Sequence, residues 1–346
     1  MISKRIYLVL GGIAILIALA VVAFVFAVKK SKEKPSVSLP EAKTEARLLA
    51  DEPVISPISS FDGGAVWFFT PKGKLFRVNI DGSGLTEAVL PAVSGTVKKA
   101  DWPSQGNDFI LTASETGGDS RYYYSNADQK YTKLPANIQN FNWLPDSRRI
   151  IYIWRSGDNV HQQLNYANAD ASGYKIITDK IFWPDFKVIP SQDGKSALLI
   201  RSKPEGDVNK IYKANLETGE IEIVLGEGKN IDAVWLPNGQ KFIFVQDAST
   251  VPKLFLYNLI THSQTDLGLS VTLDKVAVDR DGKYAYAATS KADSLGSIFY
   301  RLDLASLKQE EFFAPTSELR VRSLGLASDK LFFVSSQDSK LYLIQK

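Results

Sequence analysis

The chain has 346 residues, of which 45% are hydrophobic and 23% are charged, so it is long and apolar enough to bury a substantial core. Its formal net charge is +3, but residues 1–34 hold six Lys or Arg against one Glu, which leaves 35 basic and 37 acidic residues. A nearly neutral body lacks the charge that binding to a phosphate backbone needs, so we expect no nucleic-acid partner. The sequence has no Cys and two His, His161 and His262, which excludes disulfides and a histidine-rich metal centre. We expect neither a metal nor another cofactor.

Residues 6–28 form an uncharged apolar stretch that follows a short basic tail at residues 1–5. As a helix with a rise of about 1.5 Å per residue, this stretch would span roughly 35 Å, enough to cross a bilayer core. It is longer than the ~7–15 apolar residues of a cleaved signal peptide, so we predict an uncleaved transmembrane signal-anchor. Residues 29–43 carry several Lys and two Pro without apolar periodicity, which indicates an extended linker.

The charges that flank this stretch leave its orientation open. Lys4 and Arg5 precede it and four Lys follow it closely, so the positive-inside count favours a cytoplasmic body. A very short basic tail before an apolar run is, however, the usual start of a signal-anchor, and long downstream domains are translocated largely regardless of charge.

The remainder, residues 44–346, repeats a short strand that ends in a polar residue. The copies are 42 to 47 residues apart and end at Asn79, Asn126, Asn168, Asn215, Asn258, Asp303 and Gln345. This period is the size of one four-stranded propeller blade. An Asn or Asp at the strand end can also bond the backbone two residues on and start a tight turn. The repeat therefore predicts an all-β, seven-bladed β-propeller.

A second repeated unit, a strand, a Pro/Asp/Asn/Gly turn and an apolar strand, precedes the polar-ended strand in every copy but the first. With the strands of a blade named a to d from the centre outward, these units are strands a and b. We expect the large residue before each a–b turn to pack between neighbouring blades, at Trp102, Trp143, Val188 and Trp235. The last copy lacks strand d, and residues 44–48 resemble 86–90, the strand d of blade one. We predict that this N-terminal strand completes blade seven and closes the ring.

The turn and strand of residues 235–244, followed by the polar-ended strand of residues 253–258, resemble the WD-type β-propeller repeats of the TolB family. The resemblance covers nearly the whole body and implies a bacterial envelope protein whose propeller lies outside the cytoplasm. Together with the predicted anchor at residues 6–28, we expect a single-pass membrane protein. Two departures matter. We find no counterpart of the α/β domain that precedes the TolB propeller, and we count seven repeats against six blades in TolB, so its partner contacts do not transfer.

The sequence shows no motif for catalysis by a nucleophile. His262 falls in a hairpin turn and His161 in a loop between strands b and c, so we expect surface histidines and no enzyme. Residues 60–67 fit the S-x-D-x-G-x-x-W box of sialidase-like propellers, but the single copy is better interpreted as an Asx turn before a strand. Residues 279–282 resemble part of a calcium loop and are interpreted as a hairpin turn. Glycosidase chemistry would need paired carboxylates, and the first acids to inspect are Asp185, Glu205 and Asp207.

Connections between strands b and c differ in length from blade to blade, and they share one face of a propeller with the d–a connections. Variable loops on a rigid scaffold are where recognition is usually placed. We therefore predict an interaction face on blades three and four, formed by Trp154, Arg155, Asp158, His161, Phe182, Trp183, Asp185 and Arg201. Phe182 and Trp183 could instead seal the gap between the two blades.

These features favour a membrane-anchored envelope propeller that binds a protein or peptide partner without catalysis. An alternative is an extracytoplasmic propeller that binds or processes glycans at the mouth of its central channel. A second alternative is a scaffold that faces the cytoplasm.

Overall fold

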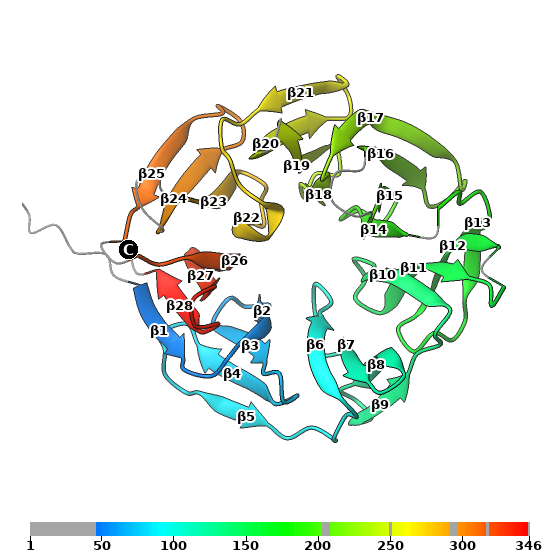
Figure 1. Cartoon of the computed structure of the whole chain (residues 1–346), viewed down its shortest axis with the longest axis horizontal. Helices are drawn as coiled ribbons and strands as arrows, with labels where there is room; N and C mark the ends of the chain where they lie inside the picture. The colour runs from blue at the N-terminus through cyan, green and yellow to red at the C-terminus, as the bar shows by residue number, and fades with distance from the viewer. Residues whose placement is uncertain are drawn as a thin grey trace, which may run out of the picture. The chain divides into compact units, whose positions relative to one another are not determined.

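The computed structural model describes residues 46–344 apart from residues 159, 184, 203–207, 249–250, 291–295 and 316–317. Within these residues the chain forms seven antiparallel four-stranded sheets arranged as the blades of a ring (Figure 1). Successive side chains of a strand point to opposite faces of its sheet. Inner strands carry continuous runs of buried residues, such as 150–153 and 242–245, so each sheet buries both faces against its neighbours. The prediction of an all-β, seven-bladed propeller is confirmed.

The first three blades follow each other without interruption. Blade one consists of β2 (Ile55–Ser59), β3 (Ala65–Phe69), β4 (Leu75–Asn79) and β5 (Thr86–Ala88). Blade two consists of β6 (Thr96–Asp101), β7 (Phe109–Glu115), β8 (Gly118–Ser125) and β9 (Lys130–Lys133). Blade three consists of β10 (Ile138–Trp143), β11 (Arg149–Arg155), β12 (Gln162–Asn168) and β13 (Lys175–Thr178).

The next three blades repeat the same order of strands. Blade four consists of β14 (Phe186–Pro190), β15 (Ser196–Arg201), β16 (Val208–Asn215) and β17 (Ile221–Lys229). Blade five consists of β18 (Asp232–Trp235), β19 (Lys241–Ala248), β20 (Val251–Asn258) and β21 (Ser263–Asp266). Blade six consists of the short 3₁₀ turn η1 (Leu273–Lys275) and of β22 (Val276–Val278), β23 (Tyr284–Ser290), β24 (Ser297–Asp303) and β25 (Gln309–Phe313).

Blade seven joins the two ends of the propeller. It contains β26 (Val321–Ala327), β27 (Lys330–Ser335), β28 (Leu341–Ile344) and, as its outermost strand, β1 (Ala46–Ala50). β1 runs antiparallel to β28, with Arg47 opposite Leu343 and Leu48 opposite Tyr342, and Figure 1 shows the two strands side by side. The N-terminal strand thus closes the ring as predicted.

The core lies between neighbouring sheets. One buried cluster joins Leu198 of blade four to Phe242 and Phe244 of blade five, and comparable clusters fill the other gaps between blades. Val188, Trp143 and Trp235 are buried in this way, as predicted from the repeat.

The polar residues that end strand c start the c–d turns. The side-chain oxygen of Asn215 accepts hydrogen bonds from the backbone N–H groups of Glu217 and Thr218 at 2.9 and 3.0 Å. Asn258 and Asp303 make the same pair of contacts in blades five and six. The repeated Asn or Asp is therefore a turn former, which confirms its interpretation.

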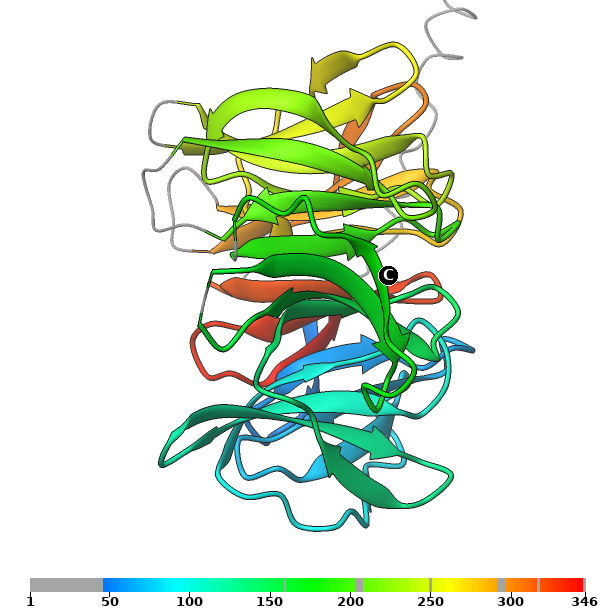
Figure 2. The same cartoon turned by 90° about the vertical axis from the view of Figure 1, so that its right-hand side faces the viewer.

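Antiparallel order places the a–b and c–d turns on one face of the ring and the b–c and d–a connections on the other. Figure 2 views the ring from the side, with the strands running between these two faces. The predicted transmembrane segment at residues 6–28 and the linker at residues 29–43 lie outside the described residues. Within the part of the chain that the structure describes, no helix has the length and apolar character that a membrane crossing requires.

Candidate functional site

The eight predicted interaction residues fall on blades three and four, on the face of the b–c and d–a connections. We call this set the recognition face. Trp154 and Arg155 end β11, Arg201 ends β15, Asp158 and His161 lie in the b–c connection of blade three, and Phe182, Trp183 and Asp185 lie between β13 and β14. The topology therefore brings the eight residues to one side of two adjacent blades.

Arg201 is the most constrained member of the recognition face. Its guanidinium carbon lies 3.9 Å from the centroid of the Trp183 ring, and its Nε lies 3.3 Å from Oδ1 of Asp185. The Arg201 side chain is 14% exposed, whereas Trp183 is 41% exposed and Phe182 is 70% exposed. Phe182 is thus largely exposed, whereas Trp183 is partly covered by the Arg201 guanidinium.

The b–c connection of blade three is held by short-range hydrogen bonds. The hydroxyl of Ser156 donates to Asp158, whose carboxylate also accepts the backbone N–H of Val160 at 2.9 Å. The Ser156 hydroxyl, the Val160 N–H and the charge of His161 together lower the pKa of Asp158 below its usual value. His161 is exposed, as is His262, which agrees with their interpretation as surface histidines.

Arg155 keeps an unused donor on this face. Its backbone is tied to Asn137 in both directions, by the Arg155 N–H to the Asn137 carbonyl at 3.0 Å and by Asn137 Nδ2 to the Arg155 carbonyl at 2.6 Å. Its side-chain Nε is buried and has no hydrogen-bond partner among the described residues.

The acids singled out for glycosidase chemistry do not form a described pair. Asp185 is engaged with Arg201, and Glu205 and Asp207 lie outside the described residues. Within the described part of the chain, no three His, Cys, Asp or Glu side chains lie close enough together to hold a metal ion.

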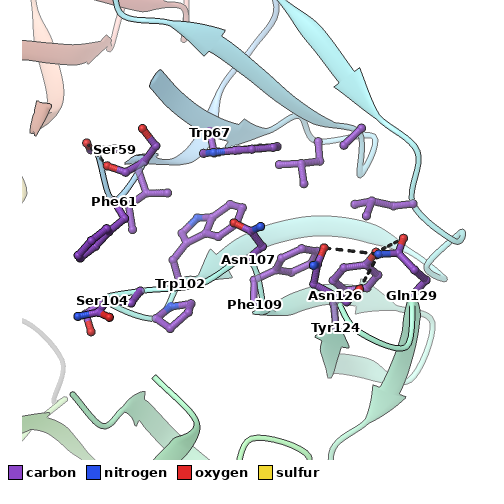
Figure 3. A pocket seen from close by; sticks show the side chains of 18 of the residues that line it. Ser59, Phe61, Trp67, Trp102, Ser104, Asn107, Phe109, Tyr124, Asn126 and Gln129 are labelled. Carbon is purple, nitrogen blue, oxygen red and sulfur yellow. Dashed lines mark hydrogen bonds between the residues drawn. The ribbon is translucent and has the colours of Figure 1, made fainter. Parts of the chain in front are cut away.

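The opposite face carries a pocket that the sequence did not indicate. It lies between blades one and two, has a volume of about 190 Å³ and opens beside their a–b turns (Figure 3). We call it the inter-blade pocket. Trp67 and Trp102 line it together with Phe109, Tyr124 and Phe61, while amides and hydroxyls come from Ser59, Ser104, Gln105, Asn107, Asn126 and Gln129.

The aromatic floor of this pocket is fixed by contacts within and between blades. Phe109 stacks on Tyr124 with ring centroids 4.7 Å apart and lies 5.2 Å from the Trp102 ring. The Tyr124 hydroxyl donates to Gln129 at 2.9 Å, and Gln129 Nε2 donates to the Asn126 carbonyl at 2.6 Å. Burial raises the pKa of Tyr124, which therefore stays neutral at physiological pH.

One lip of the pocket is the turn at residues 60–64. Ser60 donates to Asp62 at 2.6 Å, and Asp62 accepts the Gly64 N–H at 3.0 Å, so the S-x-D-x-G-x-x-W segment is an Asx turn before β3, as interpreted from the sequence. Arg280 of blade six donates to the Phe61 carbonyl and lies 5.1 Å from the Phe61 ring. The segment at residues 279–282 is a hairpin turn, in which the Gly282 N–H donates to the Asp279 carbonyl at 3.1 Å, and Arg280 of this turn holds the lip in place.

A second cavity lies on this same face, at the mouth of the central channel. A cavity of about 250 Å³ is lined there by strand-a and turn residues of blades one to five, including Trp102, Trp143 and Trp235 with the amides of Asn142 and Gln192. Carboxylates are not among the described residues that line it.

Comparison with known proteins finds the same fold among solved structures. A scan against protein-family models gives no match, and no curated protein matches the sequence. Among solved structures, an oligogalacturonate lyase in complex with manganese has a TM-score of 0.64 at 12% identity, over 88% of this chain and 94% of that one. Hydrazine synthase of Kuenenia stuttgartiensis has a TM-score of 0.57 at 14% identity, over 90% and 99%.

TolB of Acinetobacter baumannii is similar over 75% of this chain, with a TM-score of 0.51 at 13% identity, and the match spans 63% of the TolB chain. Identities this low establish the fold alone. The chain is therefore a β-propeller whose structural neighbours include TolB, which confirms the resemblance seen in the repeats at the level of fold.

Proposed function

We propose that this protein is a non-catalytic recognition propeller of the bacterial cell envelope. Residues 6–28 anchor it in the membrane, the propeller faces outside the cytoplasm, and the recognition face binds a protein or peptide partner. The observation that carries this proposal is the arrangement of Arg201, which stacks on the exposed Trp183 and pairs with Asp185.

The chemistry of the recognition face is that of a protein interface. Trp and Arg are enriched where binding energy concentrates, and such anchors are most effective when they are pre-ordered before the partner arrives. Trp183 is held by the Arg201 guanidinium, and Phe182 projects beside it with 70% of its surface exposed. A partner that covers these rings would gain the free energy of apolar burial and lose little side-chain entropy.

The neighbouring connections extend the apolar character of this face. Val160 and Val208, in or next to the b–c connections of blades three and four, are 65% and 52% exposed, and Val251 of blade five is 49% exposed. Exposed apolar residues that gather on adjacent blades support a docking surface better than scattered ones do.

Membrane attachment and an outer location rest on the sequence. The 6–28 segment has the length and composition of a single membrane span, and the similarity of the repeats to an envelope family favours translocation of the body. The absence of catalysis is proposed from the sequence, which carries no motif for a catalytic nucleophile.

Crosslinking in intact cells, followed by purification of the full chain, tests the recognition face. We expect the Phe182→Ser and Trp183→Ser variants to lose a crosslinked partner that the wild-type chain retains. Tyr174→Ser is the matched control, because Tyr174 is an aromatic residue of similar exposure, 66%, on the opposite face. A partner that survives both changes, or that is lost equally with Tyr174→Ser, would show that the recognition face is misplaced.

Protease treatment of intact cells tests the location separately. The propeller should be cleaved from whole cells if it faces outward and protected until lysis if it faces the cytoplasm. Full protection would support the cytoplasmic scaffold instead.

A further inference from the structure

The inter-blade pocket lies between blades one and two and shares no residue with the recognition face on blades three and four, so it needs an explanation of its own. It is lined by the a–b turns of blades one and two, the c–d turn of blade two, and Leu75 and residues 88–90 of the outer strands of blade one, whereas the recognition face uses the b–c and d–a connections of blades three and four. An inference about this pocket therefore does not depend on the function proposed above.

The pocket is pre-ordered. Trp102, at its centre in Figure 3, donates its Nε1–H to the Ser56 carbonyl at 2.9 Å, which fixes the ring against blade one. The turn that follows Trp102 is tied to blade three, because Ser104 Oγ and the Gln105 N–H each lie 2.9 Å from Ser147 Oγ. A ligand would find the floor and one wall already in place, which lowers the entropic cost of binding.

The size of the pocket limits what enters it. Sites for whole small-molecule ligands usually enclose roughly 300–1,000 Å³. The inter-blade pocket, at about 190 Å³, has room for one ring-sized group. It therefore suits a side chain that is delivered by a larger molecule.

The lining selects an uncharged group. None of the described lining residues is Asp, Glu, His, Lys or Arg. A charged group that entered would lose its water without meeting a counter-charge, and this desolvation is costly. The lining also includes Ile58, Leu75 and Leu90, which offer no polar side-chain atoms to the hydroxyls around a sugar ring, so it favours an apolar ring over a sugar.

The rim offers groups that match a peptide backbone. Asn107 is exposed at the mouth, and its side-chain amide has no hydrogen-bond partner among the described residues, so it can both donate and accept. Ala88 lines the pocket and also belongs to β5, the outermost strand of blade one, which has β4 as its one partner in the sheet. An open strand edge exposes backbone N–H and C=O groups that an extended peptide can pair with. Next to Ala88, Val89 is 93% exposed and adds apolar surface.

We propose that the inter-blade pocket is an anchor site for one aromatic side chain of an extended, uncharged peptide segment. The ring packs on Trp102 and Phe109, and the backbone on either side of it meets the Asn107 amide and the edge of β5. This is a second binding site, formed by other blades than the recognition face.

Saturation-transfer nuclear magnetic resonance on the full chain tests the proposal with three probes at millimolar concentration. N-acetyl-tryptophanamide presents an uncharged ring between two peptide groups, N-acetyl-tryptophan presents the same ring with a carboxylate, and methyl glucoside presents a sugar ring. We expect N-acetyl-tryptophanamide to bind at least tenfold more tightly than either of the others.

Two variants locate the binding. Ala88→Phe adds a ring to the pocket wall and should abolish binding, whereas Ile176→Phe adds one to the outermost strand of blade three and should leave it unchanged. Asn107→Ala should weaken binding severalfold, and thermal unfolding of each variant monitors the fold. The recognition-face variant Phe182→Ser should bind the probe as the wild type does, so a failure on one face is distinguished from a failure on the other.

The outcomes that overturn the proposal are equally specific. If none of the three probes binds, or if N-acetyl-tryptophanamide binds Ala88→Phe as tightly as it binds the wild type, the pocket is not an aromatic anchor. If methyl glucoside binds most tightly, the pocket is a carbohydrate site and the peptide assignment is wrong.

Discussion

The indole Nε1 of Trp143, at the end of the innermost strand of blade three, donates a 3.0 Å hydrogen bond to the backbone carbonyl of Asp101 in blade two. The contact recurs around the ring. Trp102 of blade two donates to the Ser56 carbonyl of blade one, and Trp235 of blade five donates to the Ile189 carbonyl of blade four. Each of these tryptophans thus fastens its own blade to the preceding one by packing and by a directed bond.

Replacing Trp143 separates these two contributions. Trp143→Phe keeps a large ring but removes the donor, so we expect a loss of about 1–2 kcal/mol in the free energy of unfolding. Trp143→Ala also empties the space between the blades and should cost about 3–5 kcal/mol. Trp154→Phe is the control, because Trp154 is half-buried and its indole makes no hydrogen bond among the described residues. Urea unfolding measures all three, and equal losses for Trp143→Phe and Trp154→Phe would contradict a role for the inter-blade bond.

The repeat predicted the architecture because every blade uses the same local chemistry. An Asn such as Asn258 that bonds its own turn, and a large residue such as Trp235 that packs against the preceding sheet, are visible in a single sequence at a nearly constant spacing. The ring closure was also predictable. The last repeat lacks an outer strand, and the segment near Ala46 resembles such a strand, so pairing the two completes the blade.

The inter-blade pocket could not be predicted in this way. It depends on Phe61 and Trp102, which are about forty residues apart and belong to turns of different blades, and on Arg280, which reaches the Phe61 turn from blade six. None of these residues departs from the repeat in type or position. Their convergence follows from the angle between neighbouring sheets, which a one-dimensional pattern does not contain. The grouping of Trp183, Asp185 and Arg201 was predictable only as a shared face, and their mutual contacts needed coordinates.

The a–b turns of blades one and seven touch where Gly63 meets Ser328, and this contact makes a second prediction. Gly63 has φ +70°, and a Cβ built on it would lie 2.0 Å from Ser328 Oγ and 2.8 Å from the Ser328 backbone N. Gly106 has φ +93° with nothing within 4 Å of such a Cβ. We expect Gly106→Ala to cost about 1–2 kcal/mol of stability through backbone strain alone. Gly63→Ala should cost about 1–3 kcal/mol more, because the turns must separate. Equal losses in thermal unfolding would show that the two turns are not in contact.

Glu115 gives a prediction for acid conditions. It accepts hydrogen bonds from Tyr122, from Ser120 at 2.8 Å and from Lys133 at 3.2 Å, and these contacts lower its pKa from 4.5 to about 2. A carboxyl whose pKa is lower in the folded state stabilises the fold above its unfolded pKa, and this contribution disappears as the pH falls through the folded pKa.

Glu115→Gln should therefore be less stable than the wild type at neutral pH, and the difference should shrink between pH 4.5 and about 2. Urea unfolding at a series of pH values measures both chains. A difference that stays constant over this range would mean that the carboxylate charge is not what the three donors recognise.

A disulfide across the closing strand pair tests how much of the ring's stability depends on β1. The chain has no Cys of its own, so a pair introduced at Leu48 and Tyr342, which lie opposite each other on β1 and β28, forms without competing thiols. Directly opposed residues of antiparallel strands have Cα atoms about 4.5–5.5 Å apart, which a disulfide spans.

The bond would link the two ends of the propeller and close a loop that contains nearly all of it. Because the entropy removed from the unfolded chain grows with loop length, we expect the oxidised Leu48→Cys/Tyr342→Cys variant to be about 2–5 kcal/mol more stable than the same variant reduced. Gln246→Cys/Lys253→Cys, opposite each other across the short b–c hairpin of blade five, is the matched pair and should gain less on oxidation. Comparing each variant with its own reduced form cancels the cost of the replaced side chains. If oxidation raises the urea midpoint of the hairpin pair as much as that of the closing pair, unfolding of the propeller does not require β1 to separate from β28, and the N-terminal strand is not the closure of the ring.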